Sequence, residues 1–111
     1  MTRKYTKYIH IGVDVLFLHH GQQFIWDAEK AAANLAKHGI RFEAACDVFL
    51  DPLVRSTDAS IDEESREAAI GMTEDWKLLF VVHLIREDDW IRIISARPAT
   101  PKERKFYEES D

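Results

Sequence analysis

Two apolar runs rich in β-branched residues limit the fold of this chain more than any other feature: LLFVVHLIR at 78–86 and WIRIISAR at 90–97. Both have the composition of β-strands. Only the short polar stretch 87–89 separates them, and a connection that short joins antiparallel strands, because parallel strands need a long crossover. A weaker strand, REAAIGMT at 66–73, precedes them through another short polar connection at 73–77. The three runs therefore predict antiparallel hairpins.

Two helices are predicted ahead of these strands. AEKAAANLAKH at 28–38 consists mostly of strong helix formers, with Asp27 as an N-cap and Gly39 where a left-handed C-terminal cap is expected. FEAACDVF at 42–49 repeats its apolar residues at helical spacing. This second helix is expected to stop at Pro52, because proline cannot continue the hydrogen-bond ladder.

The rest of the chain completes the predicted architecture. QFIW at 23–26 predicts a strand, and 8–18 contains a further candidate strand. Residues 53–65 are polar, acidic and turn-prone, which predicts a mobile loop. With a last helix starting at Thr100, the expected order is β-α-α-β-β-β-α. This is an α+β fold in which an antiparallel sheet packs against helices.

Length and composition bound the class of protein. The chain has 111 residues, 46% of them hydrophobic, which fits one globular domain. Cys46 is its single cysteine, so neither a disulfide framework nor a cysteine-based zinc site is expected, and a reducing compartment fits. The N-terminal apolar stretch, interrupted by His10 and Asp14, lacks the pattern of a secretory signal and is too short and polar to span a bilayer. A cytoplasmic protein without a membrane partner is the expectation.

The net charge of -5 argues against nonspecific nucleic-acid binding by the whole surface, so any such site must be a local patch. The cations of RIISARPATPKERKFYEE, at 92–109, form the best candidate patch. Part of this stretch has a purely structural explanation. Thr100, Pro101 and Glu103 supply the cap, first-turn proline and capping-box partner of the last helix.

Arg97 is the stronger phosphate candidate of the two arginines in this strand. Side chains alternate along a strand, so Arg92 and Arg97 are expected on opposite faces unless a bulge intervenes. Arg97 ends the strand, and Lys102 follows soon after, where cations can reach over the rim of the sheet. The competing explanation, which the residues alone favour, is a surface ion pair with Glu103 or Asp51.

The histidines have structural explanations of their own. A histidine within an apolar strand, as His83 is, belongs to a core more often than to a catalytic site. Lys37 and His38 end a helix, where the helix dipole favours cations. His19 and His20 are adjacent and lack the spacing of a metal site, and no carboxylate stands at a recognisable metal spacing near them. The sequence therefore assigns no metal.

Several separated motifs occur together in one order. They are WD-x-x-K-x-x-x-N-x-x-KHG at 26–39, the pair Ile70–Gly71, and RIISAR at 92–97 followed by A-x-x-x-E-x-x-x-Y at 99–107. From about Phe24 to Glu109 the chain closely resembles the BrnT family of bacterial toxins.

This resemblance implies a toxin of a type II toxin–antitoxin module with a RelE-like fold. Such toxins act as metal-independent endoribonucleases that inhibit translation, and they use no cofactor. The implied partners are RNA and a BrnA-like antitoxin with a ribbon-helix-helix domain, whose complex with the toxin represses its own operon, so that DNA is contacted only through the antitoxin. Residues 1–22 have no counterpart in the family pattern and form an N-terminal extension, and residues 23–111 form the toxin domain.

In RelE-like enzymes the 2′-hydroxyl of the RNA attacks the adjacent phosphate, which leaves a cyclic phosphate and a 5′-hydroxyl. The resemblance then suggests Arg97 as the phosphate stabiliser, Lys37 or His38 as a second cation, and His83 for proton transfer. The expected RNA contacts are Lys30, Arg92, Lys102 and Tyr107. Two alternatives stay open: a non-catalytic homologue that only binds its antitoxin in operon autoregulation, and an unrelated small hydrolase using His19 and His20.

Overall fold

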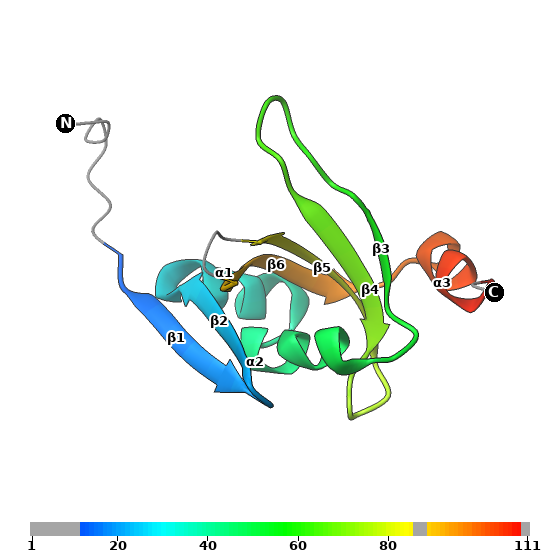
Figure 1. Ribbon diagram of the computed structural model, residues 1–111, viewed down its shortest axis with the longest axis horizontal. Helices are drawn as coiled ribbons and strands as arrows, with labels where there is room; N and C mark the ends of the chain where they lie inside the picture. Colours follow the sequence, from blue (N-terminus) through cyan, green and yellow to red (C-terminus); the bar gives the residue numbers. More distant parts are fainter. Residues whose placement is uncertain (1–11, 86–88, 110–111) are drawn as a thin grey trace.

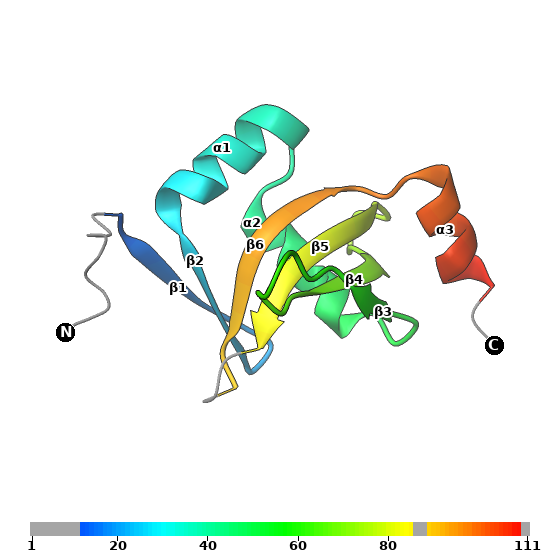
Figure 2. The ribbon, with the colours of Figure 1, turned by 90° about the horizontal axis from the view of Figure 1, so that it is seen from above.

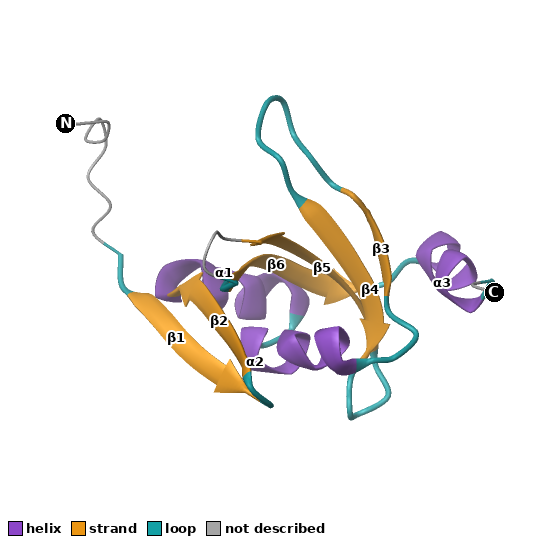
Figure 3. Cartoon of the chain, viewed as in Figure 1, coloured by secondary structure: helices purple, strands orange, loops and turns teal. Residues whose placement is uncertain are grey.

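One six-stranded sheet with the strand order β1-β2-β6-β5-β4-β3 organises the computed structural model, which describes residues 12–85 and 89–109 (Figure 1). The strands are β1 Asp14–His19, β2 Gln22–Asp27, β3 Arg55–Asp58, β4 Glu67–Met72, β5 Leu78–Ile85 and β6 Ile91–Pro98. The helices are α1 Ala28–His38, α2 Phe42–Ala45, the 3₁₀ helix η2 Cys46–Leu50 and α3 Pro101–Glu108 (Figure 3). No helix in the described part of the chain has the length and apolar character that crossing a membrane requires.

The predicted α+β class is confirmed, but the prediction of a wholly antiparallel sheet is wrong. β4, β5 and β6 pair antiparallel in succession, as their short connections require. β2, however, pairs parallel with β6, through Phe24 opposite Ile91 and Ile25 opposite Arg92. Nearly all of the toxin-like sequence lies between these two strands, so no short connection dictated their direction. The sheet is therefore mixed. Residues 86–88, in the predicted connection between β5 and β6, lie outside the described residues.

The predicted element order is also wrong, because it lacks β3 and leaves out β1, although the candidate strand at 8–18 overlaps β1. β1 lies in the predicted N-terminal extension and pairs with β2 over six residues. β3 lies within 53–65, which the sequence predicts to be a loop, and pairs antiparallel with β4. Its sequence, RSTD, shows no alternation of apolar and polar residues, because β3 is an edge strand with three of its four residues exposed. Hydrophobic periodicity cannot detect such a strand.

The helix termini follow the predicted caps closely. Asp27 accepts the backbone N–H of Lys30 at 2.9 Å, and Gly39 adopts the left-handed conformation with φ 72°. Thr100 and Glu103 complete both halves of the capping box at the start of α3. The second helix differs from the prediction, since its α-helical part is only Phe42–Ala45 and the chain then tightens into η2.

The two faces of the sheet are covered unequally (Figure 2). α1, α2 and η2 cover one face and enclose the main core, whose largest fully buried side chains include Phe24, Trp26, Phe42, Val48 and Ile93. α3 lies at the end of the opposite face, over a small cluster of Ile70, Leu78 and Tyr107. Apart from α3, no helix of the described residues covers this second face.

Candidate functional site

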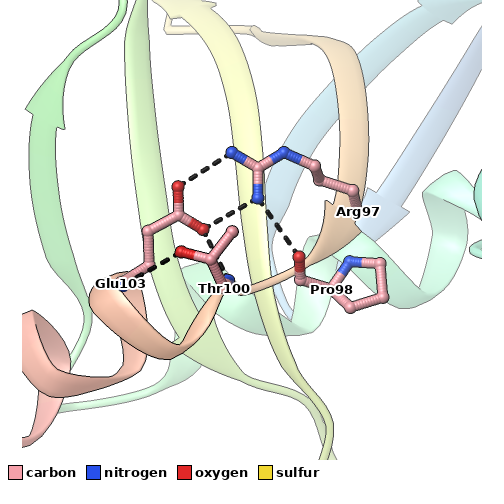
Figure 4. A network of polar contacts seen from close by, with 4 residues as sticks. All are labelled: Arg97, Pro98, Thr100 and Glu103. Carbon is pink, nitrogen blue, oxygen red and sulfur yellow. Dashed lines mark hydrogen bonds and ion pairs between the residues drawn. The ribbon is translucent and has the colours of Figure 1, made fainter.

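Arg97 lies at the end of β6 in a closely fitted setting (Figure 4). Its two terminal nitrogens donate to the two carboxylate oxygens of Glu103, both at 2.8 Å. The guanidinium carbon stands 4.1 Å from the centre of the Phe80 ring, and this stacking helps to orient the guanidinium. The side chain of Arg97 is still 33% exposed, so this oriented cation borders solvent.

Glu103 is held in place by the start of α3. Its carboxylate accepts the backbone N–H of Thr100 at 2.9 Å as part of the capping box, in addition to its two bonds from Arg97. The hydrogen bonds from Arg97 lower the pKa of Glu103, and those from Thr100 act in the same direction, while burial opposes them. The surface ion pair that was the competing explanation for Arg97 is thus present, and its partner is Glu103.

A β-bulge in β6 corrects the predicted orientation of the two arginines. Val82 pairs with Ser95, but the next residue, His83, pairs with Ile93, so Ile94 is left without a partner on β5. The extra residue reverses the alternation. Arg92 and Arg97 consequently share one face of the sheet, and the prediction of opposite faces is wrong.

Sharing a face does not make the two arginines a clamp. They are five residues apart, which along a strand is about 16 Å. Arg92 donates to the carboxylate of Asp14 on β1 at 3.1 and 3.4 Å, so it ties β6 to the N-terminal strand. Arg92 therefore lies well away from the end of β6.

The end of α1 lies beside the end of β6. β2 pairs with β6 only at Ile91 and Arg92, so Ala96 has no strand partner on that edge. The buried side chain of Asn34 takes its place: the amide donates to the Ala96 carbonyl at 2.8 Å and accepts the Ala96 N–H at 3.0 Å. Lys37 and His38 follow Asn34 by three and four positions, so they project from the same side of α1. Figure 2 shows this end of the helix next to β6. Lys37 and His38 therefore lie at the end of α1 that follows this contact with β6.

His83 faces away from this cluster. It pairs with Ile93 on the helix-covered face, is only 3% exposed, and contacts Phe49 edge-on with ring centres 4.8 Å apart. Burial lowers the pKa of its imidazole, although the hydrogen bond to the Val81 carbonyl and the charge of Glu67 oppose the shift. The sheet therefore separates His83 from Arg97, and the two cannot act on one phosphate in this arrangement.

Tyr107 has a structural partner. It is 8% exposed, and its hydroxyl donates to Asp51 at 2.6 Å. Burial, together with this hydrogen bond and the charge of Asp51, raises the pKa of Tyr107 to about 12. Asp51 also accepts the backbone N–H groups of Leu53 and Met72. Tyr107 thus fastens α3 to the body of the protein.

A family match covers most of these elements. Residues 26–103 match the family described as ribonuclease toxin, BrnT, of type II toxin–antitoxin system. The chain belongs to the BrnT family. No curated protein matches the chain. The matched part includes α1 and all of β6, whereas β1 and most of α3 lie outside it.

Within this BrnT-family fold, the predicted site residues divide into two groups. One group lies on elements that meet at β6: Arg97 near its end, Lys102 exposed in the first turn of the following helix α3, and Lys37 and His38 at the end of α1, whose Asn34 is hydrogen-bonded to Ala96 of β6. The others lie elsewhere: Lys30 at the start of α1, Arg92 near the start of β6, His83 in the main core and Tyr107 beneath α3.

A further arginine on the same face, Arg55, has no distinguishing sequence pattern around it. Arg55, Ile70, Phe80 and Arg97 pair successively across β3, β4, β5 and β6, so they form one row across the sheet. Arg55 stacks 4.2 Å from the centre of the Phe106 ring and donates to the Phe106 carbonyl. Two arginines stacked on aromatic rings therefore both contact α3, Arg55 through Phe106 and Arg97 through Glu103. Arg55 was missed because its strand looks like a loop.

Proposed function

We propose that this BrnT-family toxin is a metal-independent endoribonuclease of RelE-like fold that binds the scissile RNA phosphate at Arg97. The observation that carries the proposal is the orientation of Arg97. Phe80 and Glu103 hold its guanidinium at the rim of the sheet, with 33% of the side chain exposed. The site accordingly needs no loop closure to present a cation to RNA.

The geometry of the Arg97–Glu103 pair suits exchange for a phosphate. A guanidinium donates two parallel hydrogen bonds to a carboxylate in the same manner as to two phosphate oxygens. Glu103 therefore occupies the position that phosphate would take. A partly exposed ion pair contributes at most about 1 kcal/mol, so replacing one anion by another costs little.

The chemistry requires a cation for the developing phosphorane charge and groups that transfer protons. Attack of the 2′-hydroxyl on the phosphate forms a 2′,3′-cyclic phosphate and releases the 5′-oxygen, which takes up a proton. Arg97 supplies the charge, and Lys37 at the end of α1 supplies a second cation. We assign proton transfer to His38 in preference to His83, because His83 is buried in the main core on the face of the sheet away from Arg97.

The proposed biological setting follows from the family. A type II toxin has an antitoxin, and we infer that the antitoxin carries a ribbon-helix-helix domain and that the complex represses its own operon. Cleavage of RNA in the cytoplasm would then inhibit translation whenever the antitoxin is lost.

The test compares Arg97→Ala with Arg104→Ala, an exposed arginine of α3 whose Glu108 partner lies at 3.6 Å. Losing a charge-assisted contact of about 1.5–3 kcal/mol should slow RNA cleavage roughly ten- to a hundred-fold for Arg97→Ala only. Cleavage is measured on purified protein in excess EDTA, with a cyclic phosphate expected on the product. Growth arrest at matched expression without antitoxin should be lost in parallel. Unchanged arrest by Arg97→Ala would refute the assignment.

One observation favours a second candidate function. Both terminal nitrogens of Arg97 are engaged by Glu103, which is what a purely structural arginine would show. The protein would then be a non-catalytic homologue that binds its antitoxin in operon autoregulation. Wild-type protein that neither arrests growth nor cleaves RNA, yet still binds the antitoxin, would establish this alternative.

A further inference from the structure

We propose that His19, His20 and Glu74 form a binding site for a divalent transition-metal ion such as Zn²⁺ at the meeting point of two hairpin turns. The site is independent of the proposed ribonuclease function. Two of its ligands precede the family match at 26–103, so it belongs to the N-terminal part of this particular chain.

The turn between β1 and β2 brings the two histidines together. His19 pairs with Gln22, and the two residues between them, His20 and Gly21, have φ values of 49° and 84°. Positive φ at both positions is typical of a two-residue type I′ turn. The imidazoles of His19 and His20 lie with ring centres 4.6 Å apart. Adjacent histidines that strand alternation would send to opposite faces are thus gathered at one hairpin tip.

The turn between β4 and β5 adds the carboxylate. Glu74 follows Thr73, which closes this turn through backbone hydrogen bonds with Lys77 and Trp76. The ligand atoms of His19, His20 and Glu74 all lie within 4.8 Å of one another. Ligands of a tetrahedral zinc ion with bonds near 2.1 Å stand about 3.4 Å apart. His20 and Glu74 are exposed, so torsions of their side chains can close this difference.

Asp47 of η2 orients the cluster from behind. Its carboxylate bonds to Nε2 of His19 at 2.9 Å and accepts the backbone N–H of Glu74 at 3.1 Å. A carboxylate that accepts Nε2–H leaves the lone pair of Nδ1 available to a metal, the arrangement found behind metal-bound histidines. Asp47 is therefore a positioning residue that joins both turns at one point.

The donor set selects the class of metal. Two imidazoles and one carboxylate suit Zn²⁺, Ni²⁺ or Cu²⁺, whereas Mg²⁺ and Ca²⁺ prefer oxygen ligands alone. Three protein ligands leave a position for water. The metal would tie the β1–β2 turn to the β4–β5 turn. The bonds of both turns to Asp47 place the cluster beside η2, which packs on the helix-covered face, whereas Arg97 stacks on Phe80 on the other face.

The test uses the full chain without a histidine tag, stripped of metal with a chelator that is then removed. Titration calorimetry with ZnCl₂ should show one saturable site, and the Tm should rise with ZnCl₂ but not with MgCl₂, because a ligand that binds only the folded state stabilises it. His20→Ala and Glu74→Ala should each weaken zinc affinity at least about tenfold. The matched controls His38→Ala and Glu29→Ala should leave zinc affinity unchanged.

Asp47→Asn supplies a separate readout for the positioning role. It should lower zinc affinity about ten- to a hundred-fold, a change that a merely structural residue would not produce. Absence of one-to-one zinc binding would overturn the proposal. So would zinc binding that neither His20→Ala nor Glu74→Ala weakens.

Discussion

The Arg97–Glu103 pair controls what the end of β6 can bind. Each partner is held twice: Arg97 by Phe80 and Glu103, and Glu103 by Arg97 and Thr100. The pair serves the fold by joining β6 to α3, and it also preserves an oriented guanidinium at the protein surface. A structural ion pair and a phosphate site are therefore two states of the same residues under the proposed function.

Glu103→Gln tests this competition between carboxylate and phosphate. Glutamine keeps the capping box, because its side-chain oxygen also accepts the N-cap N–H, but it removes the competing charge. Binding of a non-cleavable 2′-O-methyl RNA, measured by fluorescence anisotropy, should tighten about two- to fivefold, as removal of up to about 1 kcal/mol implies. Glu108→Gln, which makes the same change in net charge, is the control. Equal tightening by both variants would mean that only overall charge matters.

His83 contributes to stability in a pH-dependent manner. Its folded-state pKa is lowered by burial, so between that value and about 6.5 the unfolded chain binds more protons than the folded protein. The stability contributed by neutral His83 should therefore be complete above about pH 6.5. It should be lost progressively as the pH falls below that value toward the lowered pKa of the folded protein.

His83→Gln should remove most of this pH dependence and lower stability by about 1–3 kcal/mol at pH 7. Urea unfolding at several pH values measures both effects, with His38→Gln as the control. RNA cleavage by the folded variant should persist. A large loss of cleavage without a change in stability would return His83 to the catalytic site.

At the scale of elements, the approach of η2 to β4 explains the Ile70–Gly71 motif. A Cβ atom at Gly71 would stand 2.8 Å from Cγ1 of Val48 and 3.0 Å from the Val48 carbonyl oxygen. The backbone oxygen cannot rotate away, so any side chain at this position displaces η2 from the sheet. Ile70, the preceding residue, faces the opposite side and packs under α3.

Gly71→Ala should consequently lower the free energy of unfolding by about 1–3 kcal/mol, the usual cost of overpacking. Thermal or urea denaturation measures it. The second variant is Gly71→Ala combined with Val48→Ala, which removes the nearest methyl group. A combined cost smaller than the sum of the single costs identifies the Val48 contact as the cause, and simple additivity would contradict it.

The N-terminal hairpin is continuous with the sheet of the whole molecule. β1 extends the sheet beyond β2, and Val15 and Phe17 pack against the main core, with the Phe17 and Trp26 rings 5.6 Å apart. The neighbouring residue Leu16 faces the other way and is 63% exposed. The predicted extension thus contributes to the core even though the family match begins after it.

Phe17→Ala and Leu16→Ala distinguish a packed strand from an appended one. Phe17→Ala should destabilise the protein by about 1–3 kcal/mol, because it removes apolar surface from a partly buried contact. Leu16→Ala should stay within about 0.5 kcal/mol, as exposed substitutions usually do. Equal, negligible changes in Tm for both variants would show that β1 adds nothing to the stability of the folded protein.

Local chemistry in the sequence determined the elements whose partners lie nearby in the chain. Asp27 caps the start of α1 and Gly39 caps its end, and the Thr100–Glu103 capping box starts α3. Short connections make β4, β5 and β6 antiparallel neighbours. The α+β class and the ion pair of Arg97 with Glu103 also follow from residues close together in the chain. Each of these depends on propensity, capping or turn length, which act over a few residues.

Only the tertiary structure decided the features that join distant segments. The parallel pairing of β2 with β6, the edge strand β3 and the bulge at Ile94 have no local signature. The bulge alone reversed the predicted facing of the two β6 arginines. Glu74 lies more than fifty positions after His19 and His20, so no sequence spacing could reveal their cluster. Strand registers and side-chain clusters arise when remote surfaces pack together, and that information is stored in the whole core and not in any one stretch.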